Sequence, residues 1–174
     1  VVALPDFSRT NITFAMVVNA GGPWAADVAA LAEIGTSTHL DTPLPVEPRL
    51  RPIFVVAPKQ TTGWRQQEQN RPPRLPGLDA PFLIDPDQLF VERRGLSGEF
   101  IVYSDNPNTD TTDYQLGDCT ADYEVNHSRF KTDLANKLAH RIPSLSNAQV
   151  TSSWTAVCDY NRLDQNLIIG HHPF

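Results

Sequence analysis

The stretch that decides the fold is residues 153–174, SWTAVCDYNRLDQNLIIGHHPF. It begins as an apolar run that carries the thiol of Cys158, turns through a polar Asp-Gln-Asn segment and resumes as Leu-Ile-Ile-Gly. Polar turn residues between two apolar runs are typical of a strand, a turn and a second strand. We therefore predict closing strands at 148–158 and 167–170, and we expect the domain to continue past Phe174.

Composition limits the classes of function. The 174 residues can bury one core, and 14 basic against 20 acidic residues give a net charge of −6, which argues against a nucleic-acid partner. No apolar run approaches the roughly 20 residues that cross a bilayer, so no transmembrane segment is expected. The two cysteines, Cys119 and Cys158, lack CxxC spacing and favour a reducing compartment, with a single disulfide as the open alternative.

A strand, a glycine turn and a helix are predicted near the start of the chain. The run at 12–18, ITFAMVV, predicts a buried strand, and the glycines at 21–22 allow a tight turn. A helix is predicted over 24–34, with an apolar stripe through Val28 and Leu31 as its buried face. Such a turn offers backbone N–H groups to an anionic ligand, although many α/β proteins use it for packing only.

Residues 44–57 predict one long strand. Leu50 and Phe54 share its apolar face. Pro48 and Pro52 favour an edge position or bulges, because proline donates no hydrogen bond to a neighbouring strand.

Two pairs of arginines are candidate anion ligands. Arg49 and Arg51 lie on the polar face of that strand, where they can grip a carboxylate or simply be solvated. Arg93 and Arg94 end a later strand, from which an arginine can reach a substrate carboxylate or a flavin carbonyl. Pairing with the neighbouring Glu92 at the surface is the alternative.

The remaining elements suggest a meander and a helix. Short strands at 81–85, 88–93 and 98–104 have the spacing of an antiparallel meander. A helix is predicted over 127–141, with apolar residues at i, i+4 and i+8 and with Asn126 as its N-cap. Pro143 follows the end of that helix, as expected of a helix stop.

The thiol of Cys158 has several possible roles. On an apolar strand it is usually a small buried hydrophobe, and it becomes a nucleophile only where its pKa is lowered. A Cys-His dyad or a zinc site with His171 and His172 would need these side chains to converge, which the spacing does not require. No metal site is therefore expected.

Three blocks carry a resemblance to a known family. They are VVNAGGPW at 17–24, LPVEPR at 44–49 and DYNRLDQN at 159–166. In this order they resemble the D-amino-acid oxidase, glycine oxidase and sarcosine oxidase superfamily of FAD-dependent enzymes. Within it they look most like a mitochondrial member that is linked to assembly of respiratory complex I.

The resemblance implies an α+β or α/β fragment of a larger flavoprotein, whose remainder would be a partner. Residues 1–40 would end the FAD-binding domain, 41–150 would form a substrate domain with a mixed, mainly antiparallel sheet and flanking helices, and 151–174 would return to the flavin. The dinucleotide fingerprint G-x-G-x-x-G is absent from this sequence. This piece alone is therefore not expected to hold FAD tightly.

The resemblance also implies site residues. Gly22, Trp24, Cys158, Tyr160 and Gly170 would lie at the flavin, and Cys158 falls where sarcosine oxidases place the cysteine that bonds to the ring. Arg93 and Arg94 would bind the substrate. No residue is identified as catalytic.

Two departures from the family pattern narrow the expected activity. The strand at 98–104 has no lysine where sarcosine oxidases carry one associated with oxygen activation, which favours a dehydrogenase over an oxidase. Asp159 stands where glycine oxidase has a carboxylate-binding arginine, which argues against glycine or sarcosine as substrate.

The expected function is that of a mitochondrial, FAD-dependent, amine-oxidising oxidoreductase linked to complex I assembly. The alternative is a non-catalytic assembly factor or scaffold for complex I that uses the flavoprotein fold, with loops at 60–80 and 105–122 facing partner subunits. A ligand-binding α/β domain unrelated to flavins is a third interpretation.

Overall fold

The computed structural model describes residues 2–3, 9–36, 41–59, 77–105 and 123–171. They belong to two compact units. We call Pro48–Tyr160 the sheet unit, and Val1–Glu47 together with Asn161–Phe174 the terminal unit. The division into cofactor-binding and substrate domains stays a prediction. None of the helices in the described part of the chain combines the length and the apolar character needed to span a membrane.

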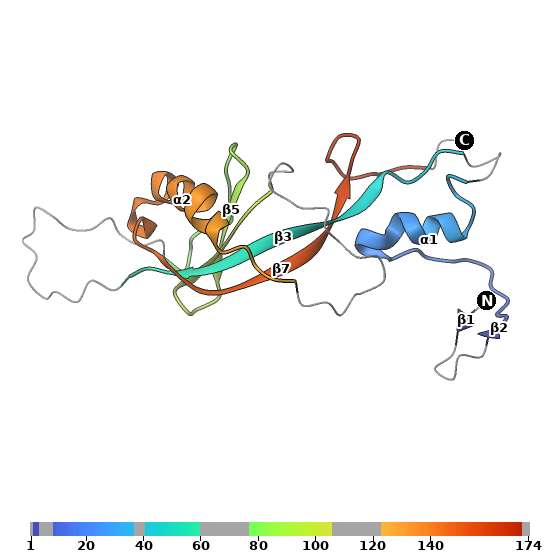
Figure 1. Cartoon of the computed structure of the whole chain (residues 1–174), viewed down its shortest axis with the longest axis horizontal. Helices are drawn as coiled ribbons and strands as arrows, with labels where there is room; N and C mark the ends of the chain where they lie inside the picture. The colour runs from blue at the N-terminus through green and yellow to red at the C-terminus, as the bar shows by residue number, and fades with distance from the viewer. Residues whose placement is uncertain (1, 4–8, 37–40, 60–76, 106–122, 172–174) are drawn as a thin grey trace, which may run out of the picture. The chain divides into compact units, whose positions relative to one another are not determined.

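The sheet unit is built on a five-stranded sheet of order β4-β5-β6-β3-β7 (Figure 1). The strands are β3 (Val46–Ala57), β4 (Leu83–Ile84), β5 (Leu89–Arg94), β6 (Glu99–Ser104) and β7 (Gln149–Asn161). Strands β4, β5 and β6 pair antiparallel in succession, so the predicted meander is confirmed. The predicted closing strand at 148–158 is confirmed as β7.

The two prolines of β3 do not place it at the edge of the sheet. β3 lies between β6 and β7, so the edge position was wrong, and the alternative of bulges stays a prediction. The antiparallel register of β3 with β6 pairs Phe54 with Val102 and extends to Val56. Pro48 and Pro52 precede this paired stretch, and their missing N–H groups therefore do not interrupt it.

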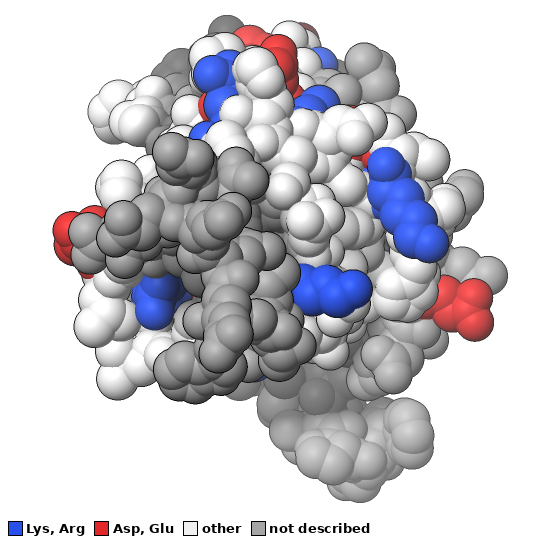
Figure 2. Space-filling model, turned by 90° about the vertical axis from the view of Figure 1, so that its left-hand side faces the viewer, with Lys and Arg blue, Asp and Glu red and all other residues white. Residues whose placement is uncertain are grey.

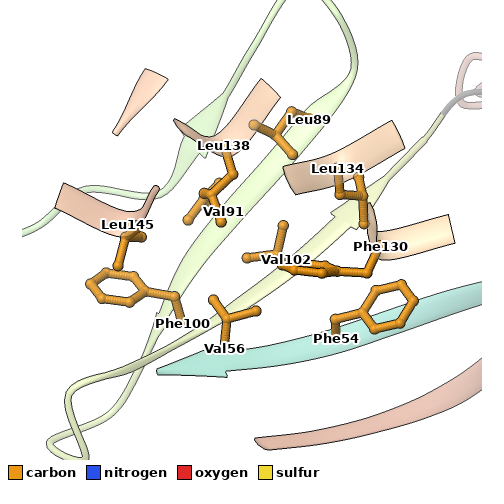
Figure 3. Packing of buried hydrophobic residues seen from close by; sticks show 10 residues of the cluster. All are labelled: Phe54, Val56, Leu89, Val91, Phe100, Val102, Phe130, Leu134, Leu138 and Leu145. Carbon is orange, nitrogen blue, oxygen red and sulfur yellow. The ribbon is translucent and has the colours of Figure 1, made fainter. Parts of the chain in front are cut away.

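One face of the sheet forms the core. Alternate residues of β3, β5 and β6 point to this face, as the two-residue period of a strand requires. Helical residues pack on them (Figure 3). The ten buried side chains are Phe54, Val56, Leu89, Val91, Phe100, Val102, Phe130, Leu134, Leu138 and Leu145.

The helical cover follows the predicted segment 127–141. It contains a π-helical turn, η3 (Phe130–Leu134), followed by α2 (Ala135–Arg141) and the short 3-10 turn η4 (Pro143–Leu145). The Oδ1 atom of Asn126 accepts a hydrogen bond from the backbone N–H of Ser128 at 3.2 Å, in the turn that leads into the helix, whereas η3 itself has Arg129 as N-cap with no side-chain hydrogen bond. The π-helical turn was not predicted, because the apolar spacing alone does not distinguish it from an α-helix.

An ion pair ties the helical cover to the sheet. The buried carboxylate of Asp85, in the turn between β4 and β5, contacts the Arg141 guanidinium at the end of α2. The same carboxylate accepts the backbone N–H of Asp87 at 2.8 Å. This backbone hydrogen bond, helped by Arg141, lowers the pKa of Asp85. The side chain of Asp85 therefore joins the turn and the helix through one charged group.

The terminal unit is different. Besides the short strands β1 (Val2–Ala3) and β2 (Arg9–Thr10), it contains the 3-10 turn η1 (Gly22–Trp24) and the helix α1 (Ala25–Leu31). The predicted strands at 12–18 and 167–170 were wrong, because neither region is a strand and side chains such as Met16 and Ile169 are exposed. A strand needs a neighbour to satisfy its backbone groups, and the described residues supply none at these two places.

The predicted helix at 24–34 is confirmed only in part. It is shorter, because Glu33 adopts a positive φ of 64°, which an α-helix cannot contain. The predicted buried stripe was wrong: Leu31 is 87% exposed and Val28 is at the limit of exposure, whereas Ala29 is the buried residue of α1.

Candidate functional site

The sheet of the sheet unit has a second face, opposite the one that the helices cover. Since side chains alternate along a strand, the residues between the core positions of β3, β5 and β6 must point to it. We call this the second face. It comprises Arg49, Arg51, Val55, Phe90, Glu92, Arg94, Glu99, Ile101 and Tyr103, together with Phe82, Asp105, Cys158 and Tyr160, which contact or influence them.

Aromatic rings form a row on the second face. Phe90 on β5 and Tyr103 on β6 are directly opposite in register, and their rings stack with centroids 4.9 Å apart at an angle of 10°. The ring of Phe82, just before β4, lies 5.9 Å from that of Phe90. The row therefore runs from the residue before β4, across β5, to the Tyr103 phenol on β6.

Charged groups surround that phenol. Burial is the first cause of a raised pKa at Tyr103, whose usual value is 10.0. Arg51 opposes the rise, and the carboxylates of Asp105 and Glu92 add to it. Arg51 is itself ion-paired with Asp105. The phenol is therefore protonated at neutral pH and can donate a hydrogen bond.

Two of the residues that the resemblance implied lie on this same face. The Arg49 guanidinium stacks on the ring of Tyr160 at 4.3 Å from its centroid. Cys158 precedes Tyr160 by two positions on β7 and is half-buried. Once ionised, its thiolate would add to the causes that raise the pKa of Tyr103, after burial and the carboxylates. The structure thus brings these predicted residues together with Arg49 and Arg51.

The predicted substrate arginines are not brought together. Because they are consecutive on β5, Arg93 and Arg94 point to opposite faces. Arg93 lies on the helix side, beside a cavity of about 180 Å³ that Leu83, Val91, Phe100 and Ile142 also line, and its Nε donates to the Gly95 carbonyl at 3.1 Å. Arg94 is exposed and pairs with Glu99 at 3.2 Å. Their role in substrate binding stays a prediction.

The glycines that the resemblance implied lie in the terminal unit. Gly22 has a φ of 53° and Gly170 a φ of 138°, both in the region that favours glycine. The turn before α1 is closed by Asn19, whose Oδ1 accepts the Gly21 N–H at 3.0 Å and whose Nδ2 donates to the Ala25 carbonyl at 2.8 Å. Trp24 donates its backbone N–H to Gly21 at 3.0 Å. Contact of these residues with a flavin stays a prediction.

Neither the sequence motif nor the cavity beside Arg93 provides for a whole FAD molecule. The cavity beside Arg93 is smaller than the roughly 300–1,000 Å³ of typical ligand pockets, and the dinucleotide fingerprint is absent from the sequence. Within the residues that the structure describes, no three His, Cys, Asp or Glu side chains gather as a metal site would require. His172 and Cys119 lie outside the described residues.

The sequence interpretation missed the aromatic row. The signal was present in the alternation of the meander strands, because it places Phe90 and Tyr103 on the face opposite the core. What the pattern could not show is that they stack, since the register of β5 on β6 sets that contact. On the side of the molecule seen in Figure 2, the lysine and arginine side chains are scattered, and some near the top lie against acidic side chains.

Comparison with known proteins identifies relatives. No known protein-family profile matches the chain. It is 35% identical over 99% of its length to FAD-dependent oxidoreductase domain-containing protein 1 of Xenopus laevis, and 35% identical over 91% to the protein of that name from Bos taurus. The Drosophila melanogaster homologue is 33% identical over 100% of the chain. The chain spans 31%, 29% and 30% of these three relatives.

A solved structure shows the same fold. The chain matches the crystal structure of glycine oxidase from Geobacillus kaustophilus with a TM-score of 0.52 over 88% of its length, at 19% identity, and covers 32% of that protein. The predicted mixed α and β fold is confirmed, as is the resemblance to FAD-dependent oxidoreductases. The chain is therefore similar, over nearly its whole length, to about three tenths of the proteins named FAD-dependent oxidoreductase domain-containing protein 1.

Proposed function

We propose that this chain is the substrate-side part of an FAD-dependent oxidoreductase that oxidises amines. The observation that carries the proposal is the second face, where a half-buried, protonated Tyr103 shares the surface with the Arg51–Asp105 ion pair and with the Arg49 guanidinium stacked on Tyr160. Polar groups that converge on an otherwise apolar surface are typical of sites that orient a ligand. The similarity to FAD-dependent oxidoreductases supports the same conclusion.

In this proposal the remainder of the polypeptide is the partner that holds the cofactor. The relatives are about three times as long as this chain, and FAD, when bound, supplies the electron acceptor. The chain's own residues orient the substrate, with Tyr103 as hydrogen-bond donor and the ion pair fixing the position of Arg51. The exposed apolar residues at 12–18 and 167–170 would be covered by that remainder.

Flavin binding tests the proposal directly. The full-length polypeptide that carries this chain is expected to be yellow after purification, or to bind added FAD, with flavin absorbance in proportion to protein. Cys158→Ser tests the predicted covalent bond, because flavin that stays on the polypeptide after denaturation should be lost in this variant and kept in Cys119→Ser. A colourless full-length protein that takes up no FAD would sink the proposal.

We also propose a mitochondrial location and a role in respiratory complex I assembly, with electrons passed to a protein partner rather than to oxygen. This proposal rests on the resemblance of the sequence blocks and on the absence of lysine from β6. Deletion of residues 66–74, which lie outside the described residues, is expected to slow complex I assembly in cells while flavin content stays unchanged. Normal assembly on native gels would contradict it.

A further inference from the structure

We propose that the second face selects a protonated amine that carries an aromatic or extended apolar group and no carboxylate. Glu92 would receive the amine, and the aromatic row of Phe82, Phe90 and Tyr103 would receive the apolar group. The inference rests on the proposed function and names the substrate class for that face.

The aromatic row supplies the apolar contact. Its rings lie 4.9 Å and 5.9 Å apart, within the range in which aromatic groups attract one another, so a further ring can join the row without rearranging it. Phe82 is 48% exposed, and the neighbouring Ile84 on β4 is 63% exposed. The outer end of the row is therefore accessible, while its inner end meets the polar groups around Tyr103.

Glu92 supplies the charge. It follows Phe90 by two positions on β5 and lies opposite Ile101, so its side chain shares the face with the aromatic row. The side chain is exposed, and within the described part of the chain it makes no hydrogen bond or ion pair. Its charge nevertheless reaches Tyr103. A carboxylate beside aromatic faces attracts an ammonium group both directly and through cation–π contact.

The other charges of the second face favour a cation over a carboxylate. Arg51 is already paired with Asp105, and Arg49 is stacked on Tyr160. Arg94, which shares the face of Glu92, is paired with Glu99 at 3.2 Å. A substrate carboxylate would have to compete with these contacts, whereas an ammonium group meets Glu92 without displacing a partner. The face is therefore complementary to an amine that has an apolar body, and poorly complementary to a small amino acid such as glycine.

Calorimetric titration of the FAD-loaded, full-length protein tests the inference, with 2-phenylethylamine as the probe and glycine as the comparison. The protein is expected to bind 2-phenylethylamine more tightly than glycine. Glu92→Gln should raise the Kd for the amine about threefold, as expected for an exposed charge pair. Phe90→Leu, which keeps the apolar volume but removes the ring, should raise it about fivefold.

Glu124→Gln is the matched control. Glu124 precedes Val125, which packs against the helix-covered core, and its loss should leave the Kd unchanged. The inference is overturned if the FAD-loaded protein binds glycine more tightly, fails to bind 2-phenylethylamine, or binds it equally in the wild type and both second-face variants. Failure of the proposed function would look different, because FAD would then be absent before any titration. Glu92→Gln changes an exposed group, so misfolding would not confuse its result.

Discussion

The sheet unit and the terminal unit differ in how far their apolar side chains are buried. In the sheet unit the apolar positions of three strands and of the helical cover are buried against one another, with Phe54, Leu138 and Val102 at or near zero exposure. In the terminal unit, Met16 is 80% exposed and Leu167 is 85% exposed. An apolar run therefore predicts a buried strand only where the same chain supplies the surface that buries it.

This contrast explains which sequence patterns were informative. The helix at 127–141 and the meander both find their partners among the described residues of the same chain, and the buried face of the helix was predicted. The run at 12–18 has an equally strong β pattern and has no neighbouring strand among the described residues. The run at 12–18 is indeed apolar. The sequence does not show which surface, if any, covers it, and the strand prediction depended on that surface.

A matched pair of leucine truncations gives the largest expected effect and tests the contrast. Leu138→Ala in α2 removes a side chain that is 1% exposed, and should lower the free energy of unfolding by about 3 kcal/mol. Leu31→Ala in α1 removes one that is 87% exposed, and should change it by no more than about 0.5 kcal/mol. Urea denaturation followed by circular dichroism measures both values. Equal losses in the two variants would break the comparison.

The candidate site was predictable only in part, for a related reason. Cys158 and Tyr160 were implied by the family blocks, and the alternation of residues 44–57 placed Arg49 and Arg51 on the polar face. The contacts that give these residues a shared environment come from strands that are distant in sequence. Register, which sets the stacking of Phe90 on Tyr103, is not encoded in either strand alone.

The two arginines that end β5 show how a short motif can mislead. Consecutive basic residues suggest one binding site, yet consecutive residues of a strand face opposite ways. Arg93 lies on the helix side, and Arg94 pairs with Glu99, which also accepts a hydrogen bond from Thr151 at 2.8 Å. The contacts of Arg94 and Glu99 hold the β5–β6 hairpin together next to its turn. Before a ligand is assigned to consecutive arginines on a strand, each arginine should therefore be assigned to its own face of the sheet.

A smaller effect is expected from the charge that links the turn between β4 and β5 to the helical cover. The Asp87 N–H and the Arg141 guanidinium lower the pKa of Asp85 from its ordinary 3.8. A carboxylate with a lowered pKa stabilises the fold at pH values above the ordinary pKa, and this stabilisation is lost as the pH falls through the lowered native value. Asp85→Asn should therefore reduce stability at neutral pH and weaken the dependence of stability on pH in the acid range.

Urea denaturation at neutral pH and at about pH 3 measures this dependence. Asp87→Asn is the control, because it lies in the same turn and keeps the backbone N–H that Asp85 accepts, so its acid dependence should match the wild type. An unchanged acid dependence in Asp85→Asn would show that Asp85 does not link the turn to α2 through its charge. The buried apolar contacts, with the hydrogen bond from Lys137 Nζ to the Asp87 carbonyl at 3.4 Å, would then attach the helical cover to the sheet, and the contrast with the terminal unit would rest mainly on hydrophobic burial.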